Sequence, residues 1–153
     1  MKTEKSTPRI LPPLYLLAAI IIMVVLGIII PIGYWLLSLW RYVGIMFILI
    51  GFILIAVSRT LFRQLGTPLP PGVQATVLVT KGIFQHTRNP MYLGGVVMLV
   101  GIAILLGSFS PVIVIPFFIW TIQSNFILQE EKWMESWFGE SYLEYKKKTR
   151  RWL

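Results

Sequence analysis

The chain has 153 residues, of which 56% are hydrophobic and only 13% are charged. Soluble globular domains carry about 25% charged residues, so this composition excludes an ordinary soluble domain and predicts one small membrane domain over residues 1–153. The net charge of +8 comes from basic residues that flank apolar segments, so it indicates topology and contact with anionic lipid headgroups rather than a nucleic-acid partner. With no cysteine and one histidine, His86, the sequence predicts neither a disulfide nor a metal site.

Long gaps between the charged residues predict the membrane helices. A helix that crosses a bilayer needs about 20 apolar residues. The predicted spans are 14–30, 42–58, 91–107 and 111–128. The expected fold is therefore an all-α integral membrane protein of about four transmembrane helices. A cytoplasmic loop at 64–90 and a tail at 129–153 with an amphipathic helix complete it.

The basic residues also predict the orientation. Lys2, Lys5 and Arg9 precede the first apolar run, which raises the alternative of a signal peptide. That run is too long for a signal sequence and lacks a small-x-small cleavage site, so a span is the better interpretation. Further basic residues follow the second and fourth spans, and only Arg41 falls in a loop on the other side. The positive-inside rule then places both termini in the cytoplasm, with the chain in the plasma (inner) membrane.

The four predicted spans contain no Asp, Glu, Lys, Arg or His. Transporters commonly place such costly residues inside the membrane, so transport is poorly supported. A non-enzymatic membrane protein, either a transporter or a scaffold, remains the alternative to an enzyme. The polar side chains gather instead in the loop and the tail.

The loop ends in a short polar sequence before span three. The β-branched run Thr76–Thr80 favours an extended, strand-like piece, followed by a turn at Gly82. Span three should begin at Pro90, since proline suits a first helical turn. Free backbone N–H groups there would suit an anion, and Arg88 lies beside them. Alternatively, Arg88 only marks the inside edge of the membrane and Tyr92 belongs to its aromatic belt.

The tail begins with two adjacent acids, Glu130 and Glu131. Neighbours on a helix point about 100° apart, so we expect one to face a ligand and the other to face water or Lys132. The aromatic residues within 133–138 repeat at helical spacing and predict an interfacial helix that ends at Gly139. The alternative is a simple membrane-surface anchor.

The order of these motifs resembles the isoprenylcysteine carboxyl methyltransferase and phospholipid methyltransferase superfamily, in its bacterial type. The resemblance covers residues 64–153. The matching motifs are Gly66-Thr67-Pro68, Leu78-Val79-Thr80-Lys81-Gly82-Ile83-Phe84-Gln85, Arg88-Asn89-Pro90-Met91-Tyr92-Leu93-Gly94, Glu130-Glu131, Phe138-Gly139-Glu140-Ser141-Tyr142-Leu143-Glu144-Tyr145 and Arg151-Trp152. The chain departs from the family at residues 82–85, where Gly-Pro-Tyr-Arg is usual, and at Asn89, where many relatives have histidine. It also lacks the arginine that eukaryotic members carry one turn before the glutamate.

The resemblance implies methyl transfer from S-adenosyl-L-methionine to a small hydrophobic or lipidic acceptor through a carboxylate or an amine. It implies the lipid bilayer as surroundings and no obligate protein partner. The cofactor-binding residues it implies are Val79, Gly82, Phe84, Arg88, Asn89, Tyr92, Leu93, Glu130 and Glu131. Glu130 and Arg88 are the implied catalytic residues, and Arg151 and Trp152 are the implied substrate-binding residues.

Overall fold

In the computed structural model of the chain, the structure describes residues 11–34, 39–68 and 72–153. These residues form helices and no strand, which confirms the all-α prediction. The α-helices are α1 (Pro12–Ile29), α2 (Val43–Gln64), α3 (Pro90–Leu106), α4 (Val114–Ile122), α5 (Leu128–Phe138) and α6 (Glu140–Lys148). Short 3-10 helices are η1 (Trp40–Tyr42), η2 (Gly82–Gln85) and η3 (Ser110–Ile113), and η4 (Gln123–Ile127) is a π-helical turn.

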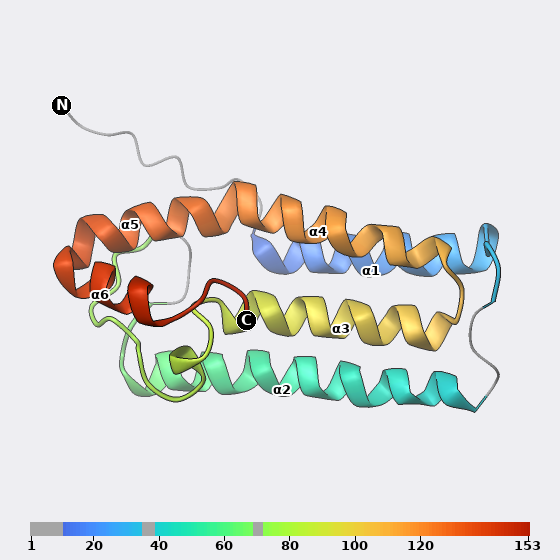
Figure 1. The fold of residues 1–153 in the computed structure, drawn as a ribbon, viewed down its shortest axis with the longest axis horizontal. Coiled ribbons are helices and arrows are strands. Elements are labelled where there is room, and N and C mark those ends of the chain that lie inside the picture. Colours follow the sequence, from blue (N-terminus) through green and yellow to red (C-terminus); the bar gives the residue numbers. More distant parts are fainter. Residues whose placement is uncertain (1–10, 35–38, 69–71) are drawn as a thin grey trace.

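The first four α-helices lie side by side along the long axis of the molecule (Figure 1). α2 packs on α3, and α3 also contacts α1 and α4. A buried apolar core joins α1, α3 and α4 through Met23, Leu99 and Ile122. The loop after α2, together with α5, α6 and the C-terminal residues, gathers at one end of this bundle (Figure 1). We call this end the polar end.

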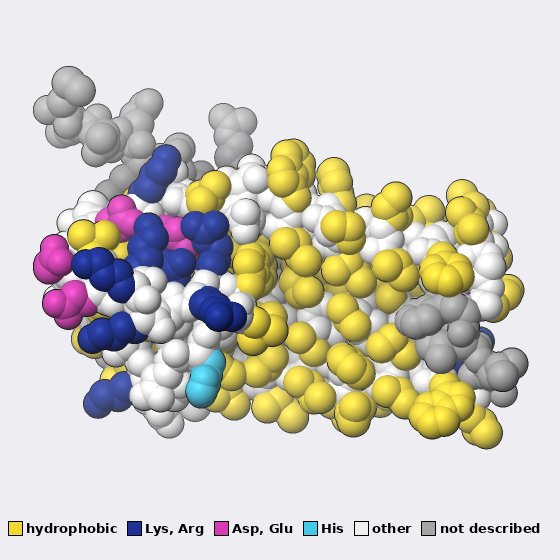
Figure 2. All heavy atoms as spheres, in the orientation of Figure 1, with side chains coloured by type: hydrophobic (Ala, Val, Ile, Leu, Met, Phe, Trp, Pro, Cys, Tyr) yellow, Lys and Arg dark blue, Asp and Glu magenta, His cyan; other side chains and the backbone are white. Residues whose placement is uncertain are grey.

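The surface of the bundle identifies an integral membrane protein. Apolar side chains cover its length, whereas lysines, arginines and acids collect at the polar end (Figure 2). The segments Pro12–Ile29, Trp40–Gln64 and Ser110–Phe138 are long and apolar enough to cross a bilayer. α3 is a shorter apolar helix of 17 residues. The four predicted apolar helices are therefore present.

Three features of the predicted elements differ from the structure. α2 continues to Gln64, beyond the predicted end at residue 58, since its first breaker is Gly66 with a φ of 61°. The predicted amphipathic helix of the tail is present in α5 and ends before Gly139, as predicted. It is, however, continuous with α4 through the π-helical turn η4. The run Thr76–Thr80 forms no strand, as no other described segment pairs with it.

Both ends of α3 are fixed by specific residues. Pro90 occupies its first turn, as predicted. At the other end, Gly107 adopts a φ of 69°, and the helix stops there. Arg41 from η1 donates hydrogen bonds to the Leu105 and Leu106 carbonyl oxygens, each at 2.9 Å. These are helix-end carbonyls that have no partner within the helix, and a cation is favourable beside them. Arg41 thus caps the short helix.

Glycines let α2 and α3 approach at backbone contact. A Cβ at Gly51 would lie 2.4 Å from the Gly94 carbonyl oxygen, and a Cβ at Gly94 would lie 2.7 Å from the Gly51 oxygen. Gly44 and Gly101 make a second contact of this kind. The next residue, Gly95, has room, since its Cβ would meet nothing nearer than Leu16 at 3.5 Å. The position of α3 therefore depends on the glycines that face α2.

Adjacent glycines give a matched test of this packing. We expect Gly94→Ala to destabilise the protein by about 1–3 kcal/mol, because the methyl group forces the two backbones apart. Gly95→Ala should be neutral or stabilising by up to about 1 kcal/mol through helix propensity. Thermal unfolding in detergent, followed by tryptophan fluorescence, measures both. Equal melting temperatures would contradict the close approach.

Candidate functional site

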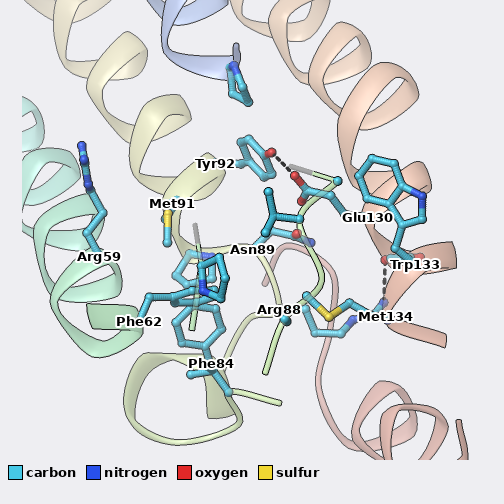
Figure 3. Close-up of a pocket in the computed structure, with 18 of the residues that line it drawn as sticks. Arg59, Phe62, Phe84, Arg88, Asn89, Met91, Tyr92, Glu130, Trp133 and Met134 are labelled. Carbon is cyan, nitrogen blue, oxygen red and sulfur yellow. Dashed lines mark hydrogen bonds and ion pairs between the residues drawn. The ribbon is translucent and has the colours of Figure 1, made fainter. Parts of the chain in front are cut away.

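A cavity of about 470 Å³ opens at the polar end, between the bundle and the tail (Figure 3). Apolar side chains make up most of its wall, and a few polar groups converge on it, as in many small-molecule sites. It is lined by α1 through Pro12 and Leu16, by α2 through Ile55, Arg59 and Phe62, by α3 through Met91, Tyr92 and Gly95, by α4 through Phe118, and by α5 through Glu130, Glu131, Trp133, Met134 and Trp137. The cavity is therefore shared by membrane helices and polar segments.

Arg88 is the buried cation of this cavity. It lies just before Pro90, and only 9% of its side chain is exposed. Its Nη2 is 3.4 Å from the Glu131 Oε1 atom. Its Nε and Nη1 atoms are buried and have no hydrogen-bond partner in the described part of the chain. A buried guanidinium with unused donors is costly unless a ligand supplies acceptors, so Arg88 fits an anionic ligand group.

Glu130 faces the same cavity from α5. The Tyr92 hydroxyl donates a hydrogen bond of 2.7 Å to its Oε1 atom (Figure 3). Among the described residues, its Oε2 atom has no partner. One oxygen is thus held in place while the other is available to a cation, a hydroxyl group or an amine.

Glu131 has a different environment, although it is the next residue. Arg151 donates to it in a bidentate manner, with Nε–Oε1 at 2.8 Å and Nη2–Oε2 at 2.9 Å. Lys146 lies 3.9 Å from its Oε2 atom, and Arg88 lies beside Oε1. Three cations therefore surround this carboxylate, which is 8% exposed. The two acids face different groups, as predicted. The expectation that the second acid faces water or Lys132 is wrong, because Glu131 is buried among these three cations.

The C-terminal residues are bound to the segment that precedes α3. The Arg88 backbone N–H donates to the Arg150 carbonyl oxygen at 2.9 Å. The Arg151 carbonyl oxygen accepts from the Thr87 hydroxyl at 3.2 Å and from Asn89 Nδ2 at 3.0 Å. Trp152 Nε1 donates to Gln123 Oε1 in the π-helical turn at 3.0 Å. The tail is thus part of the wall behind the cavity.

The structure brings most of the predicted site residues to one cavity. Those that line it are Val79, Phe84, Arg88, Asn89, Tyr92, Glu130 and Glu131. Gly82, Leu93, Arg151 and Trp152 do not line it. Gly82 forms the turn into η2 with a φ of 59°, and Arg151 and Trp152 contact Glu131 and Gln123. That these four residues bind cofactor or substrate stays a prediction.

Several lining residues were not predicted from the sequence. Trp133 and Trp137 line the cavity and stack with their ring centroids 6.3 Å apart. Their spacing of four residues places them on one face of a helix, but the same spacing also fits an interfacial anchor. In the sequence, Arg59 indicated only which side of the membrane follows the second span, yet its side chain lines the cavity from α2. Tyr142 and Tyr145 line it from α6, and burial raises the pKa of Tyr142 to about 12. The Tyr145 hydroxyl donates to the Phe84 carbonyl oxygen at 2.6 Å and holds η2 against α6.

Comparison with known proteins gives a consistent result. Residues 39–141 match the family model described as phospholipid methyltransferase. Protein-S-isoprenylcysteine O-methyltransferases are similar in sequence: the Schizosaccharomyces pombe protein is 38% identical over 73 residues, which cover 48% of this chain and 31% of that protein. For the Dictyostelium discoideum protein the identity is 38% over 71 residues, covering 46% and 30%.

An uncharacterized Haemophilus influenzae protein is 38% identical over 63 residues, 41% of this chain and all of that protein. The chain spans about a third of the length of the named methyltransferases it matches. No solved structure matches the chain.

The contact between α6 and η2 can be tested by deleting one hydroxyl. We expect Tyr145→Phe to destabilise the protein by about 1–3 kcal/mol, because it leaves the buried Phe84 carbonyl without its donor. Tyr42→Phe is the control, since Tyr42 is 64% exposed. Thermal unfolding in detergent measures both, and equal shifts would show that the hydroxyl of Tyr145 contributes nothing specific.

Proposed function

Because the chain belongs to the phospholipid methyltransferase family, we propose that it transfers a methyl group from S-adenosyl-L-methionine to a small hydrophobic or lipidic acceptor in the membrane. The observation that carries this proposal is the pair of unused donors on Arg88 in the wall of a largely apolar cavity. The relatives named as methyltransferases support the reaction type.

The residues of the cavity fit the proposed cofactor. When bound, S-adenosyl-L-methionine supplies a methyl group on a sulfonium sulfur. Arg88 would hold its carboxylate, because a guanidinium donates two parallel hydrogen bonds to such a group. The N–H groups at the start of α3 would add to this attraction. Val79 and Phe84 would form part of the apolar slot for its adenosine, and Asn89 is another residue of the cavity wall.

Glu130 is the residue that we propose to face the reacting groups. Tyr92 orients its carboxylate, and the available oxygen can bind an ammonium or a hydroxyl group, or accept a proton from an amine acceptor. The apolar wall contributes by excluding water, which strengthens these interactions.

The membrane helices in the cavity wall suggest the route of the acceptor. Pro12 and Leu16 of α1 and Ile55 and Arg59 of α2 line the cavity near the polar end of the bundle. These helices carry exposed apolar side chains along their length. We propose that an acceptor with an apolar chain enters sideways from the bilayer and presents its polar end to Glu130.

The charge distribution supports the proposed orientation. Basic residues collect at the polar end (Figure 2). The last turn of α6 alone contains Lys146, Lys147 and Lys148. We propose that this end, with both termini, faces the cytoplasm from the plasma membrane. The cofactor would then reach the cavity from the compartment that holds it.

Binding of S-adenosylhomocysteine tests the cofactor. We expect the wild-type protein in detergent to bind it, and Arg88→Ala to weaken binding about tenfold to a hundredfold through the lost charged hydrogen bonds. Arg63→Ala is the control, as Arg63 is exposed and does not line the cavity. Isothermal titration calorimetry measures all three. Absence of binding in the wild type would overturn the proposed function, and unchanged binding in Arg88→Ala would overturn the role of Arg88.

Transfer of a labelled methyl group to a membrane lipid extract tests the reaction. We expect Glu130→Gln to lower turnover about a hundredfold or more, as expected for loss of a proton acceptor. Glu144→Gln, on the exposed face of α6, should leave it unchanged. Alkaline treatment of the product distinguishes the acceptors, because methyl esters release methanol and methylated amines do not. Full activity of Glu130→Gln would contradict its proposed role.

A further inference from the structure

We propose that Arg151 is a positioning residue that keeps Arg88 available to a ligand by occupying Glu131. Arg151 does not line the cavity, and its effect would pass through one carboxylate. The inference rests on the proposed function, in which Arg88 binds the carboxylate of the cofactor.

The contact between Arg151 and Glu131 fixes the direction of the carboxylate. Two parallel hydrogen bonds of 2.8 and 2.9 Å join the guanidinium to both oxygens. Bidentate pairs of this kind define an orientation as well as adding energy. The carboxylate is 8% exposed, so water competes little for it.

Because Arg151 occupies Glu131, Arg88 makes only a partial contact with that carboxylate. Arg88 approaches Oε1 with Nη2 alone, at 3.4 Å, and its Nε and Nη1 atoms stay without partners. Without Arg151, Arg88 is the nearest cation that could form the bidentate pair with Glu131. Its unused donors would then turn from the cavity to the carboxylate, and its affinity for a ligand anion would fall.

The backbone of the tail holds Arg151 in place independently of its side chain. The Thr87 hydroxyl and Asn89 Nδ2 both donate to the Arg151 carbonyl oxygen, and the Arg88 N–H donates to the oxygen of Arg150. A change of the Arg151 side chain therefore leaves these anchors intact. We expect such a change to alter mainly the contact between Glu131 and Arg88.

Two ligands that differ only at the amino-acid end separate positioning from general stability. S-adenosylhomocysteine carries the carboxylate, whereas 5′-methylthioadenosine keeps the adenosine and sulfur without it. We expect Arg151→Gln to weaken S-adenosylhomocysteine about tenfold, the effect of losing charged hydrogen bonds, and to leave 5′-methylthioadenosine unchanged. Calorimetry on the full chain in detergent gives both affinities.

The neighbouring arginine is the matched control. Arg150 is exposed, and within the described residues its side chain reaches only the Leu153 carbonyl oxygen, at 3.5 Å. Arg150→Gln removes the same charge and should change neither affinity. In an Arg88→Ala background, Arg151→Gln should cause no further loss, since its effect passes through Arg88. Arg151→Lys restores the charge without the bidentate geometry, so it should recover only part of the affinity.

The outcomes distinguish the two proposals. If the wild type binds S-adenosylhomocysteine and Arg151→Gln weakens both ligands equally, or neither, the positioning role is overturned while the cofactor stands. A further loss in the Arg88→Ala background would also overturn it. If the wild type binds neither ligand, the proposed function fails, and this inference fails with it.

Discussion

The buried guanidinium of Arg88 is the constraint on which the polar end depends. A charge with 9% exposure needs compensation from the protein, or the structure would not retain it. Glu131 provides the countercharge, and Arg151 and Lys146 then share that carboxylate. The compensation is incomplete, since two nitrogens of Arg88 have no partner in the described chain. This incompletely compensated cation in the cavity wall is the reason that we propose an anionic ligand group there.

The bundle controls where this cation lies. Arg88 comes just before α3, so its place follows from the place of that helix. α3 is short, and it is fixed against α2 by glycine contacts near its start and near its end. Arg41 caps its far end. A shift of α3 along α2 would move Arg88 and Tyr92 together, relative to Glu130 on α5. Tight backbone packing between α2 and α3, which begins beside the cavity at Gly94 and continues to Gly101, therefore sets the geometry within it.

The sequence was sufficient for the membrane helices and for much of the cavity wall. Gaps between charges predict helices because a bilayer excludes charge, and Pro90 predicts a helix start because its ring fixes φ. The contacts of the tail could not be predicted in this way. Arg150 and Arg151 accept hydrogen bonds through backbone oxygens, which every residue has. The continuation of α4 into α5 was also not predicted, because a π-helical turn leaves no clear pattern in the order of the side chains.

The two adjacent acids show how one helix serves the cavity and its support at once. Consecutive helical residues point about 100° apart, so Glu130 and Glu131 cannot share a partner set. Tyr92 from α3 meets the first, and Arg151 from the tail meets the second. The match to the family model ends at residue 141, within α6, before Arg151. Two of the three cations around Glu131, Lys146 and Arg151, therefore lie beyond that match. In this chain, the division of work between the two acids depends on a tail that is bound, through its backbone, to the same segment that carries Arg88.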